Sequence, residues 1–250
     1  MNVILGVSVF ILGTIIGSFL NVVICRFNTG RSPLAGRSCC FSCGKQLRFY
    51  ELIPLVSYFV QNRKCRTCDA NISGQYAAVE AITGFIFLAV FAKLGFFVGA
   101  VPVASLLFWW TVVALFMIIT VYDLRHTIIP DTFVYLLVLM GLGNLIARQG
   151  GLPDFMTGLL IALFFFVIWF VSRGRAMGLG DAKLAIAIGW LLPWSMALTA
   201  VILGVWIGAL VGLVLLMLRS RNYSLSSELP FAPFLAIGTL LTFVCSISLF

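Results

Sequence analysis

Long apolar runs separated by short polar segments fill most of the chain. A helix crosses about 30 Å of hydrocarbon with roughly 20 residues, because each residue rises 1.5 Å. Several of the apolar runs reach that length. The pattern predicts about eight transmembrane helices, near residues 3–25, 77–98, 101–122, 129–147, 155–172, 182–193, 197–218 and 231–249. The sixth of these spans is short and ends at Pro193.

The apolar runs favour helices over the strands of a membrane β-barrel. Barrel strands alternate apolar and polar residues, whereas residues 159–171 show no alternation. Composition excludes an ordinary water-soluble domain, since 62% of the 250 residues are hydrophobic and only 10% are charged. We therefore expect an all-α polytopic membrane protein.

The basic residues indicate the orientation of the chain. Lys and Arg in short connections are retained on the cytoplasmic side of a membrane. With an external N-terminus, every basic residue except Lys93 and Arg148 falls inside. No basic residue precedes the first apolar run and Arg26 follows it, the reverse of a secretory signal peptide, so we expect this run to remain as an anchor.

The net charge of +8 could suggest a nucleic-acid partner. Topology and attraction to anionic membrane lipid already explain how this charge is distributed. We therefore expect membrane lipid, and no nucleic acid, as the partner of these basic residues.

Only one connection is long enough to form a small domain. We expect a first transmembrane helix at 1–25, a cytoplasmic tetracysteine loop domain at 26–76 and a membrane-embedded bundle at 77–250. Small residues at four-residue spacing allow helix backbones to approach closely in lipid. Such glycines are Gly13, Gly17, Gly204, Gly208 and Gly212.

Two C-x-x-C pairs in the loop predict a zinc site. They are Cys40 with Cys43 and Cys65 with Cys68, a spacing close to that of zinc ribbons. The cytoplasm keeps thiols reduced, so metal ligation explains this clustering better than disulfides do. Four thiolates fill a tetrahedral ion, which favours a structural zinc over a catalytic one. Cys39 adjoins Cys40 and is an alternative ligand with a less usual spacing.

The chain has only eight acidic residues, and acids at membrane depth or at helix ends are costly. Asp123 ends a predicted span, where the helix dipole disfavours a negative charge. That unfavourable position marks a candidate site, although a surface ion pair with Arg125 or His126 is the alternative interpretation.

Asp181 opens the sixth predicted span in the sequence GLGDAK, residues 178–183. Gly178 and Gly180 leave room for an extended substrate backbone to approach the carboxylate. Lys183 is a candidate for binding substrate, orienting a carboxylate or contacting lipid phosphate. The alternative is that Asp181 only favours the dipole of a first helical turn.

The predicted topology puts Asp123 and Asp181 at the same membrane face. Two adjacent carboxylates share a proton, so that one activates water while the other protonates a substrate carbonyl. This is the chemistry of an aspartyl peptidase.

Two other acidic residues have different interpretations. Asp131 follows Pro130 and is better explained as a first-turn residue of a helix. Glu80 is a candidate to bind a substrate amine or a loop arginine.

Several segments resemble the type IV prepilin peptidase family. They are residues 17–26 (GSFLNVVICR), the paired cysteines, and residues 51–58 (ELIPLVSY), 74–80 (GQYAAVE), 123–131, 178–183 and 230–238 (PFAPFLAIG). They match in order and cover nearly the whole chain.

The resemblance implies a GxGD-type aspartyl peptidase of the bacterial inner membrane, with its N-terminus in the periplasm. It would remove a basic leader from prepilins and pseudopilins at the cytoplasmic face, with Asp123 and Asp181 as the essential pair. Many members of the family also methylate the new N-terminal amine with S-adenosylmethionine. The cysteine loop is associated with these methylating forms, so the resemblance implies that second activity here.

Two other classes of protein compete with this interpretation. A transporter would bury its ionisable residues near the midplane of the membrane, where its helices break. A noncatalytic assembly factor that holds pilins through the zinc loop would need no carboxylate pair. Two acids at one membrane face favour the peptidase over both.

Overall fold

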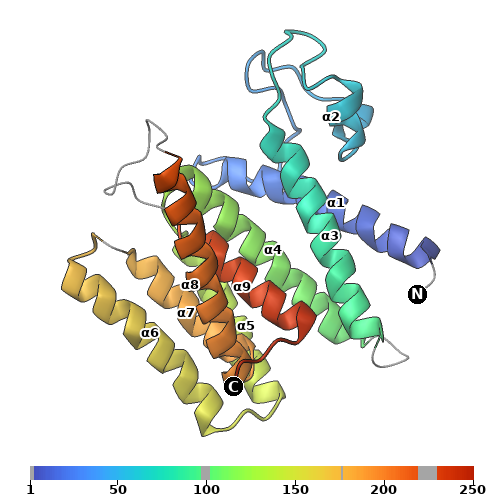
Figure 1. The fold of residues 1–250 in the computed structure, drawn as a ribbon. Helices are drawn as coiled ribbons and strands as arrows, with labels where there is room; N and C mark the ends of the chain where they lie inside the picture. Colours follow the sequence, from blue (N-terminus) through green and yellow to red (C-terminus); the bar gives the residue numbers. More distant parts are fainter. Residues whose placement is uncertain (1–2, 97–101, 176, 219–229) are drawn as a thin grey trace. The chain divides into compact units, whose positions relative to one another are not determined.

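Each of the eight predicted spans coincides with a helix in a computed structural model of the protein (Figure 1). The structure describes residues 3–96, 102–175, 177–218 and 230–250, and among these there is no strand. The helices that coincide with the predicted spans are α1 (Val3–Arg26), α3 (Gly74–Phe96), α4 (Val103–His126), α5 (Asp131–Ala147), α6 (Leu152–Ser172), α7 (Leu179–Leu191), α8 (Trp194–Met217) and α9 (Ala232–Cys245). Two short helices, η1 (Phe49–Leu52) and α2 (Val56–Val60), lie in the connection between α1 and α3.

The helices confirm an all-α membrane protein but not the number of crossings. Five of them, α1, α3, α4, α6 and α8, are long and apolar enough to cross a membrane. Helices α5 and α9 are apolar but shorter, and α7 has only 13 residues. Eight crossings therefore remain a prediction. The predicted span ends at 97–98 and at 101 lie outside the described residues.

The chain divides into two compact units, residues 1–118 and 119–250, which are described separately. In the first unit, α1 packs along α3. A Cβ atom on Gly13 would lie 2.7 Å from the Cα of Gly84, and one on Gly17 would lie 2.9 Å from the Cα of Glu80. The predicted packing role of these two α1 glycines is therefore confirmed.

The first part of α4 also belongs to this unit and packs on α3. The indole N–H of Trp110 donates to the carbonyl of Phe87 at 3.2 Å. The two aromatic rings stack with their centroids 5.0 Å apart. The hydrogen bond satisfies the polar tip of the otherwise apolar, half-buried Trp110 side chain.

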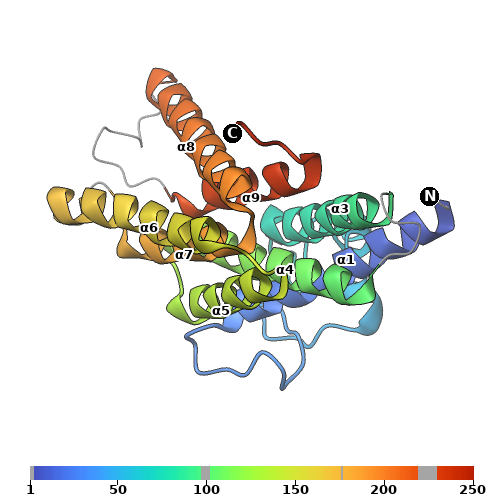
Figure 2. The ribbon, with the colours of Figure 1, turned by 90° about the horizontal axis from the view of Figure 1, so that it is seen from below.

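In the second unit, the short helix α7 contacts α5, α6, α8 and α9. It lies beside α6 in both ribbon views (Figures 1 and 2). Most of its side chains are buried, and Leu184, Ala185 and Ile188 have no exposed surface. A 13-residue helix that is apolar on nearly every face is stable only when other helices surround it.

Glycines allow these helices to approach one another closely. Gly189 of α7 lies directly against Gly158 of α6. A Cβ on Gly141 of α5 would lie 2.9 Å from the carbonyl oxygen of Ala187 in α7. Gly204 of α8 lies against the backbone of α9, which also confirms its predicted packing role. A Cβ on Gly208 would lie 3.1 Å from a ring atom of Phe234 and 3.3 Å from one of Phe231, in agreement with the same prediction.

Side chains of α5 and α6 satisfy the backbone around the end of α7. Asn144 donates to the carbonyl of Leu191 at 2.9 Å, and Arg148 donates to the carbonyl of Leu192 at 2.7 Å. Asp154 of α6 accepts a hydrogen bond from the N–H of Trp194 at 2.7 Å. The Nη1 of Arg148 lies 3.6 Å from the Oδ1 of Asp154. These bonds supply partners that a helix end lacks within itself.

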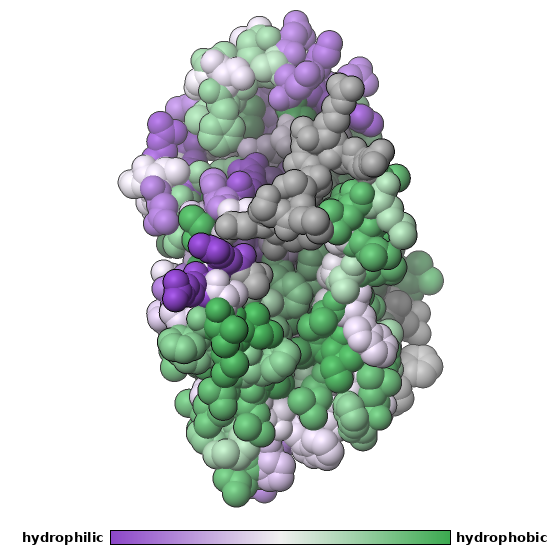
Figure 3. All heavy atoms as spheres, turned by 60° about the vertical axis from the view of Figure 1, so that its left-hand side comes forward, coloured by the Kyte–Doolittle hydropathy of each residue, from purple (hydrophilic) through white to green (hydrophobic). Residues whose placement is uncertain are grey.

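Apolar side chains also cover much of the outer surface, as expected of a protein in lipid. Figure 3 shows a broad continuous area of hydrophobic residues on the face that it displays, with polar residues gathered elsewhere on that face. In α6, Leu160, Phe164, Phe170 and Val171 are more than half exposed. In water this much exposed apolar surface would favour aggregation.

Two neighbouring glycines of α5 test the close-packing argument. Gly141→Ala should destabilise the protein by about 1–3 kcal/mol, because the added methyl meets the backbone of α7. A Cβ on Gly143 would meet no atom within 4 Å, so Gly143→Ala should leave stability unchanged or raise it slightly. Thermal unfolding in detergent measures both. Equal midpoints for the two variants would contradict the packing role of Gly141.

Candidate active site and metal centre

Asp123 lies in the last turn of α4, within the second unit, and only 4% of its surface is exposed. Its Oδ2 accepts a hydrogen bond of 3.2 Å from the backbone N–H of Ala232, the first residue of α9. The N-terminus of a helix favours negative charge. The start of α9 therefore compensates a carboxylate that is unfavourably placed on its own helix.

Asp181 lies in the first turn of α7 and is 5% exposed. Its backbone N–H donates to the carbonyl of Gly178, the N-cap residue, at 3.3 Å. Its Oδ1 is buried and makes no hydrogen bond within the described part of the chain. A buried polar atom without a partner is rare in proteins and needs an explanation.

The structure brings Asp123 and Asp181 together in one unit. Their carboxyl groups lie near enough for the charge of Asp123 to act on Asp181. Both are buried, and two neighbouring carboxylates in such surroundings cannot easily ionise together. The pair is thus suited to hold one shared proton.

The two glycines before Asp181 have different surroundings. Gly178 has an extended backbone, and a Cβ there would lie an ordinary 3.6 Å from the Oδ2 of Asp181. A Cβ on Gly180 would lie only 2.8 Å from the Cβ of Ile129. Packing against Ile129 therefore gives Gly180 a structural reason to lack a side chain, and a substrate role for either glycine remains a prediction.

Lys183 forms an ion pair that no sequence pattern indicated. Its Nζ lies 2.7 Å from the Oδ1 of Asp131, the first residue of α5, and 5.3 Å from the centre of the Tyr135 ring. Asp131 does lie in a first helical turn as predicted, but Pro130 is the N-cap residue that precedes it. No short sequence spacing reveals the pair, because its members are 52 residues apart.

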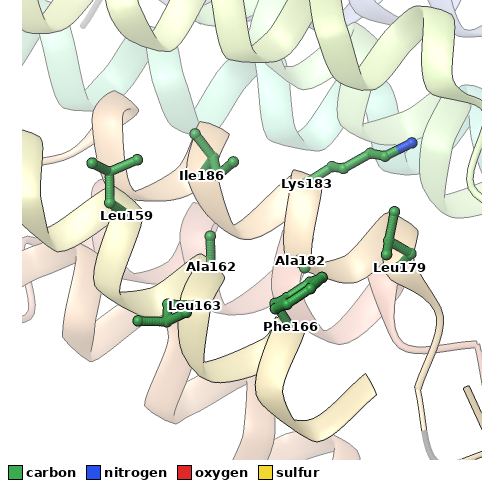
Figure 4. Close-up of a pocket in the computed structure, with 8 residues that line it drawn as sticks. All are labelled: Leu159, Ala162, Leu163, Phe166, Leu179, Ala182, Lys183 and Ile186. Atoms are coloured by element: carbon green, nitrogen blue, oxygen red, sulfur yellow. The ribbon is translucent and has the colours of Figure 1, made fainter. Parts of the chain in front are cut away.

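An open apolar groove runs between α6 and α7 (Figure 4). Leu159, Leu163 and Phe166 line it from α6, and Leu179, Ala182 and the aliphatic part of Lys183 line it from α7. In Figure 4 the Lys183 ammonium points away from these apolar side chains. The groove therefore offers hydrophobic contacts and no free charge.

The four predicted metal ligands converge in the first unit. The sulfur atoms of Cys40, Cys43, Cys65 and Cys68 all lie within 4.8 Å of one another. Backbone N–H groups of Thr67 and Cys68 donate to the Cys65 sulfur and lower the pKa of its thiol to about 6, whereas burial and the neighbouring thiols outweigh the backbone N–H of Ala70 and raise the pKa of Cys68 to about 12. A lowered pKa favours the thiolate, which is the form that binds metal. Cys39, the alternative ligand, is not part of this cluster.

Each C-x-x-C pair lies in a tight turn of the same kind. The N–H of Gly44 donates to the carbonyl of Cys40 at 2.9 Å, and the N–H of Asp69 donates to the carbonyl of Cys65 at 3.0 Å. Both Gly44 and Asp69 have a positive φ. Two matching turns facing each other can hold a four-thiolate metal ion of the structural type.

Two buried glutamates hold the loop around this cluster. Glu51 accepts from the N–H of Arg48 at 2.8 Å, with Lys45 3.5 Å away, and both contacts lower the pKa of its carboxyl group. Glu80 of α3 accepts from the N–H of Leu55 at 2.8 Å. The predicted role of Glu80 in binding a substrate amine or an arginine is untested, but its hydrogen bond ties the loop to α3.

Comparisons with known proteins cover both units. The family model of the bacterial peptidase A24 N-terminal domain matches residues 11–94, and that of the type IV leader peptidase family matches residues 110–213. The second match includes both Asp123 and Asp181. No solved structure matches the chain significantly.

Several curated relatives are named prepilin leader peptidase/N-methyltransferase. The protein of Bacillus subtilis is 32% identical over 94% of this chain and 92% of its own length, and that of Aeromonas hydrophila is 33% identical over 92% and 87%. The protein of Myxococcus xanthus is 33% identical to this chain. The alignment covers 86% of this chain and 64% of the Myxococcus protein. The chain therefore belongs to the type IV leader peptidase family.

Proposed function

We propose that this chain cleaves the leader peptide from prepilins and pseudopilins with Asp123 and Asp181, and methylates the new N-terminus. The chain is an enzyme of the prepilin leader peptidase/N-methyltransferase type, since relatives named for both activities align with most of its length. The observation that carries the catalytic assignment is the pair of buried, interacting carboxylates in the second unit.

The pair accounts for peptide hydrolysis without a metal ion at the reaction centre. The ionised aspartate takes a proton from water, and the resulting nucleophile attacks the carbonyl carbon of the scissile peptide. The protonated aspartate donates to the carbonyl oxygen, which gives a tetrahedral intermediate. When its C–N bond breaks, the aspartate that took the proton from water gives it to the leaving amine nitrogen, and the hydroxyl proton returns to the other aspartate. The unpartnered Oδ1 of Asp181 supports this role, because it is free to accept from water or donate to substrate.

The proposed location is the bacterial inner membrane, with the N-terminus in the periplasm and both sites at the cytoplasmic face. Five apolar helices make the chain a membrane protein. The distribution of lysine and arginine supports the orientation. A basic leader that stays in the cytoplasm, followed by an apolar helix, would present its junction at this face.

We propose zinc as the ion held by Cys40, Cys43, Cys65 and Cys68. Four sulfur ligands in paired C-x-x-C turns suit a structural zinc, which would supply folding free energy to a loop with little apolar core. S-adenosylmethionine, by the name of the relatives' second activity, would supply the methyl group. Residues 11–94 of the first unit match a family model of their own, which supports a role for this region separate from that of the aspartate pair.

Replacing either catalytic candidate tests the peptidase assignment. Asp123→Asn and Asp181→Asn should each lower the rate of prepilin cleavage at least about 100-fold, since each removes an acid or base. Cleavage of a prepilin in membranes, with thermal unfolding as a check of folding, measures the effect. Asp154→Asn is the control, because the remaining amide oxygen can still accept from Trp194. Normal cleavage by a folded Asp123 or Asp181 variant refutes the pair.

Metal analysis tests the zinc assignment. The reduced, unchelated protein should contain about one zinc per chain, and Cys40→Ser or Cys65→Ser should lower that content well below half. Cys39→Ser should keep its metal, because Cys39 lies outside the cluster. Loss of zinc from Cys39→Ser with retention by Cys40→Ser would reverse the assigned ligands.

Mass analysis of the processed pilin tests the second activity. Wild-type protein supplied with S-adenosylmethionine should add one methyl group to the new N-terminal amine. Omission of the donor should leave cleavage intact and the amine unmodified, because the aspartate pair needs no methyl donor. An unmodified amine despite added donor would count against methylation by this chain.

A further inference from the structure

The ion pair between Lys183 and Asp131 joins the two chain segments that carry Asp181 and Asp123. We infer that this pair sets the distance between the two aspartates, so that Lys183 and Asp131 are positioning residues for leader-peptide cleavage. The inference rests on the proposed catalytic role of Asp123 and Asp181. It assigns Lys183 a role within the protein in place of direct contact with substrate.

Each partner of the ion pair is close in the sequence to one of the two aspartates. Asp123 lies three residues before the end of α4, and α5 begins at Asp131 after a short connection. Thr127 ties that connection to α4, since its N–H donates to the carbonyl of Asp123 at 2.8 Å. Lys183 lies in the same helical turn as Asp181. Holding Lys183 against Asp131 therefore holds one aspartate-bearing segment against the other.

A second contact joins the same two segments. Ile129, in the connection before α5, packs against Gly180 of α7. A Cβ on Gly180 would lie 2.8 Å from the Cβ of Ile129. The contacts at Gly180 and Lys183 flank Asp181 along α7. Packing against Ile129 limits how closely the segments approach, and the ion pair opposes their separation.

The positions of Lys183 and Asp131 on their helices support a role for the ion pair in positioning the two chain segments. Lys183 is the fifth residue of α7, close to a helix start that offers a cation no favourable interaction, whereas Asp131 is favourably placed in the first turn of α5. The 2.7 Å contact supplies this lysine with a partner. It also directs the ammonium to Asp131, and the described residues include no ion pair of Asp181 with any cation.

The pair is too exposed to contribute much to stability. The side chains of Lys183 and Asp131 are 25% and 54% exposed, and solvent weakens such pairs. Catalysis is far more sensitive to geometry, since a displacement of about 1 Å can lower a rate about 100-fold. Loss of the pair should therefore reduce turnover while leaving the protein folded.

A double-mutant cycle tests the proposal with a synthetic prepilin and the full-length protein in detergent. Lys183→Met and Asp131→Ala should each lower kcat by the same factor, about tenfold or more, while KM changes by less than about twofold. The double variant should be no slower than either single variant, because both remove one interaction. Lys183→Arg keeps the pair and should retain most of the wild-type kcat.

Arg148→Met provides a matched control at the opposite end of α5, where Arg148 pairs with Asp154. It should change kcat less than about twofold. A higher KM in Lys183→Met with normal kinetics in Asp131→Ala would overturn the proposal and make Lys183 a substrate ligand. Additive losses in the double variant would also overturn it. All these variants retain Asp123 and Asp181, so failure here is distinct from failure of the catalytic assignment.

Discussion

The second unit depends on close contact between helix backbones around α7. Gly158, Gly189 and Gly141 remove the side chains that would otherwise separate α5 and α6 from this short helix. In lipid, helices gain little from burying apolar surface, so close van der Waals packing has to hold them together. The position of Asp181 follows from this packing, because α7 carries it in its first turn. The helix that carries Asp181 is thus held in place by apolar contacts about two turns away from this residue.

Helix ends, more than side-chain cations, shape the electrostatics of the aspartate pair. Asp123 is disfavoured at the end of α4 but accepts a hydrogen bond from the start of α9. Asp181 benefits from the start of α7. Lys183, only two residues from Asp181, is paired with Asp131. The result is a buried acidic pair that backbone dipoles stabilise and that forms no ion pair with a cation among the described residues, which suits a site that must hold and transfer a proton.

Sequence patterns predicted most of the architecture because they depend on local physics. Apolar runs located helices α1 and α3 to α9, and the C-x-x-C spacing identified the four sulfur atoms that converge. The contact of Asp123 with Ala232 spans 109 residues and depends on helix packing, so no local pattern could reveal it. The same holds for Lys183 with Asp131. The brevity of α7 was partly visible in Pro193, yet whether its 13 residues cross the membrane is not decided by their hydropathy.

The length of α7 also bears on the membrane around the protein. Thirteen residues span about 20 Å, roughly two thirds of a typical hydrocarbon core. If Asp181 lies at one surface, the other end of α7 falls short of the opposite surface, and Asn144 and Arg148 supply hydrogen bonds to the carbonyls of Leu191 and Leu192 at that end. Without these side chains, the carbonyl groups of Leu191 and Leu192 would lack these hydrogen bonds in a membrane. The hydrophobic mismatch is thus accommodated partly inside the protein, which reduces the need for the surrounding lipid to thin.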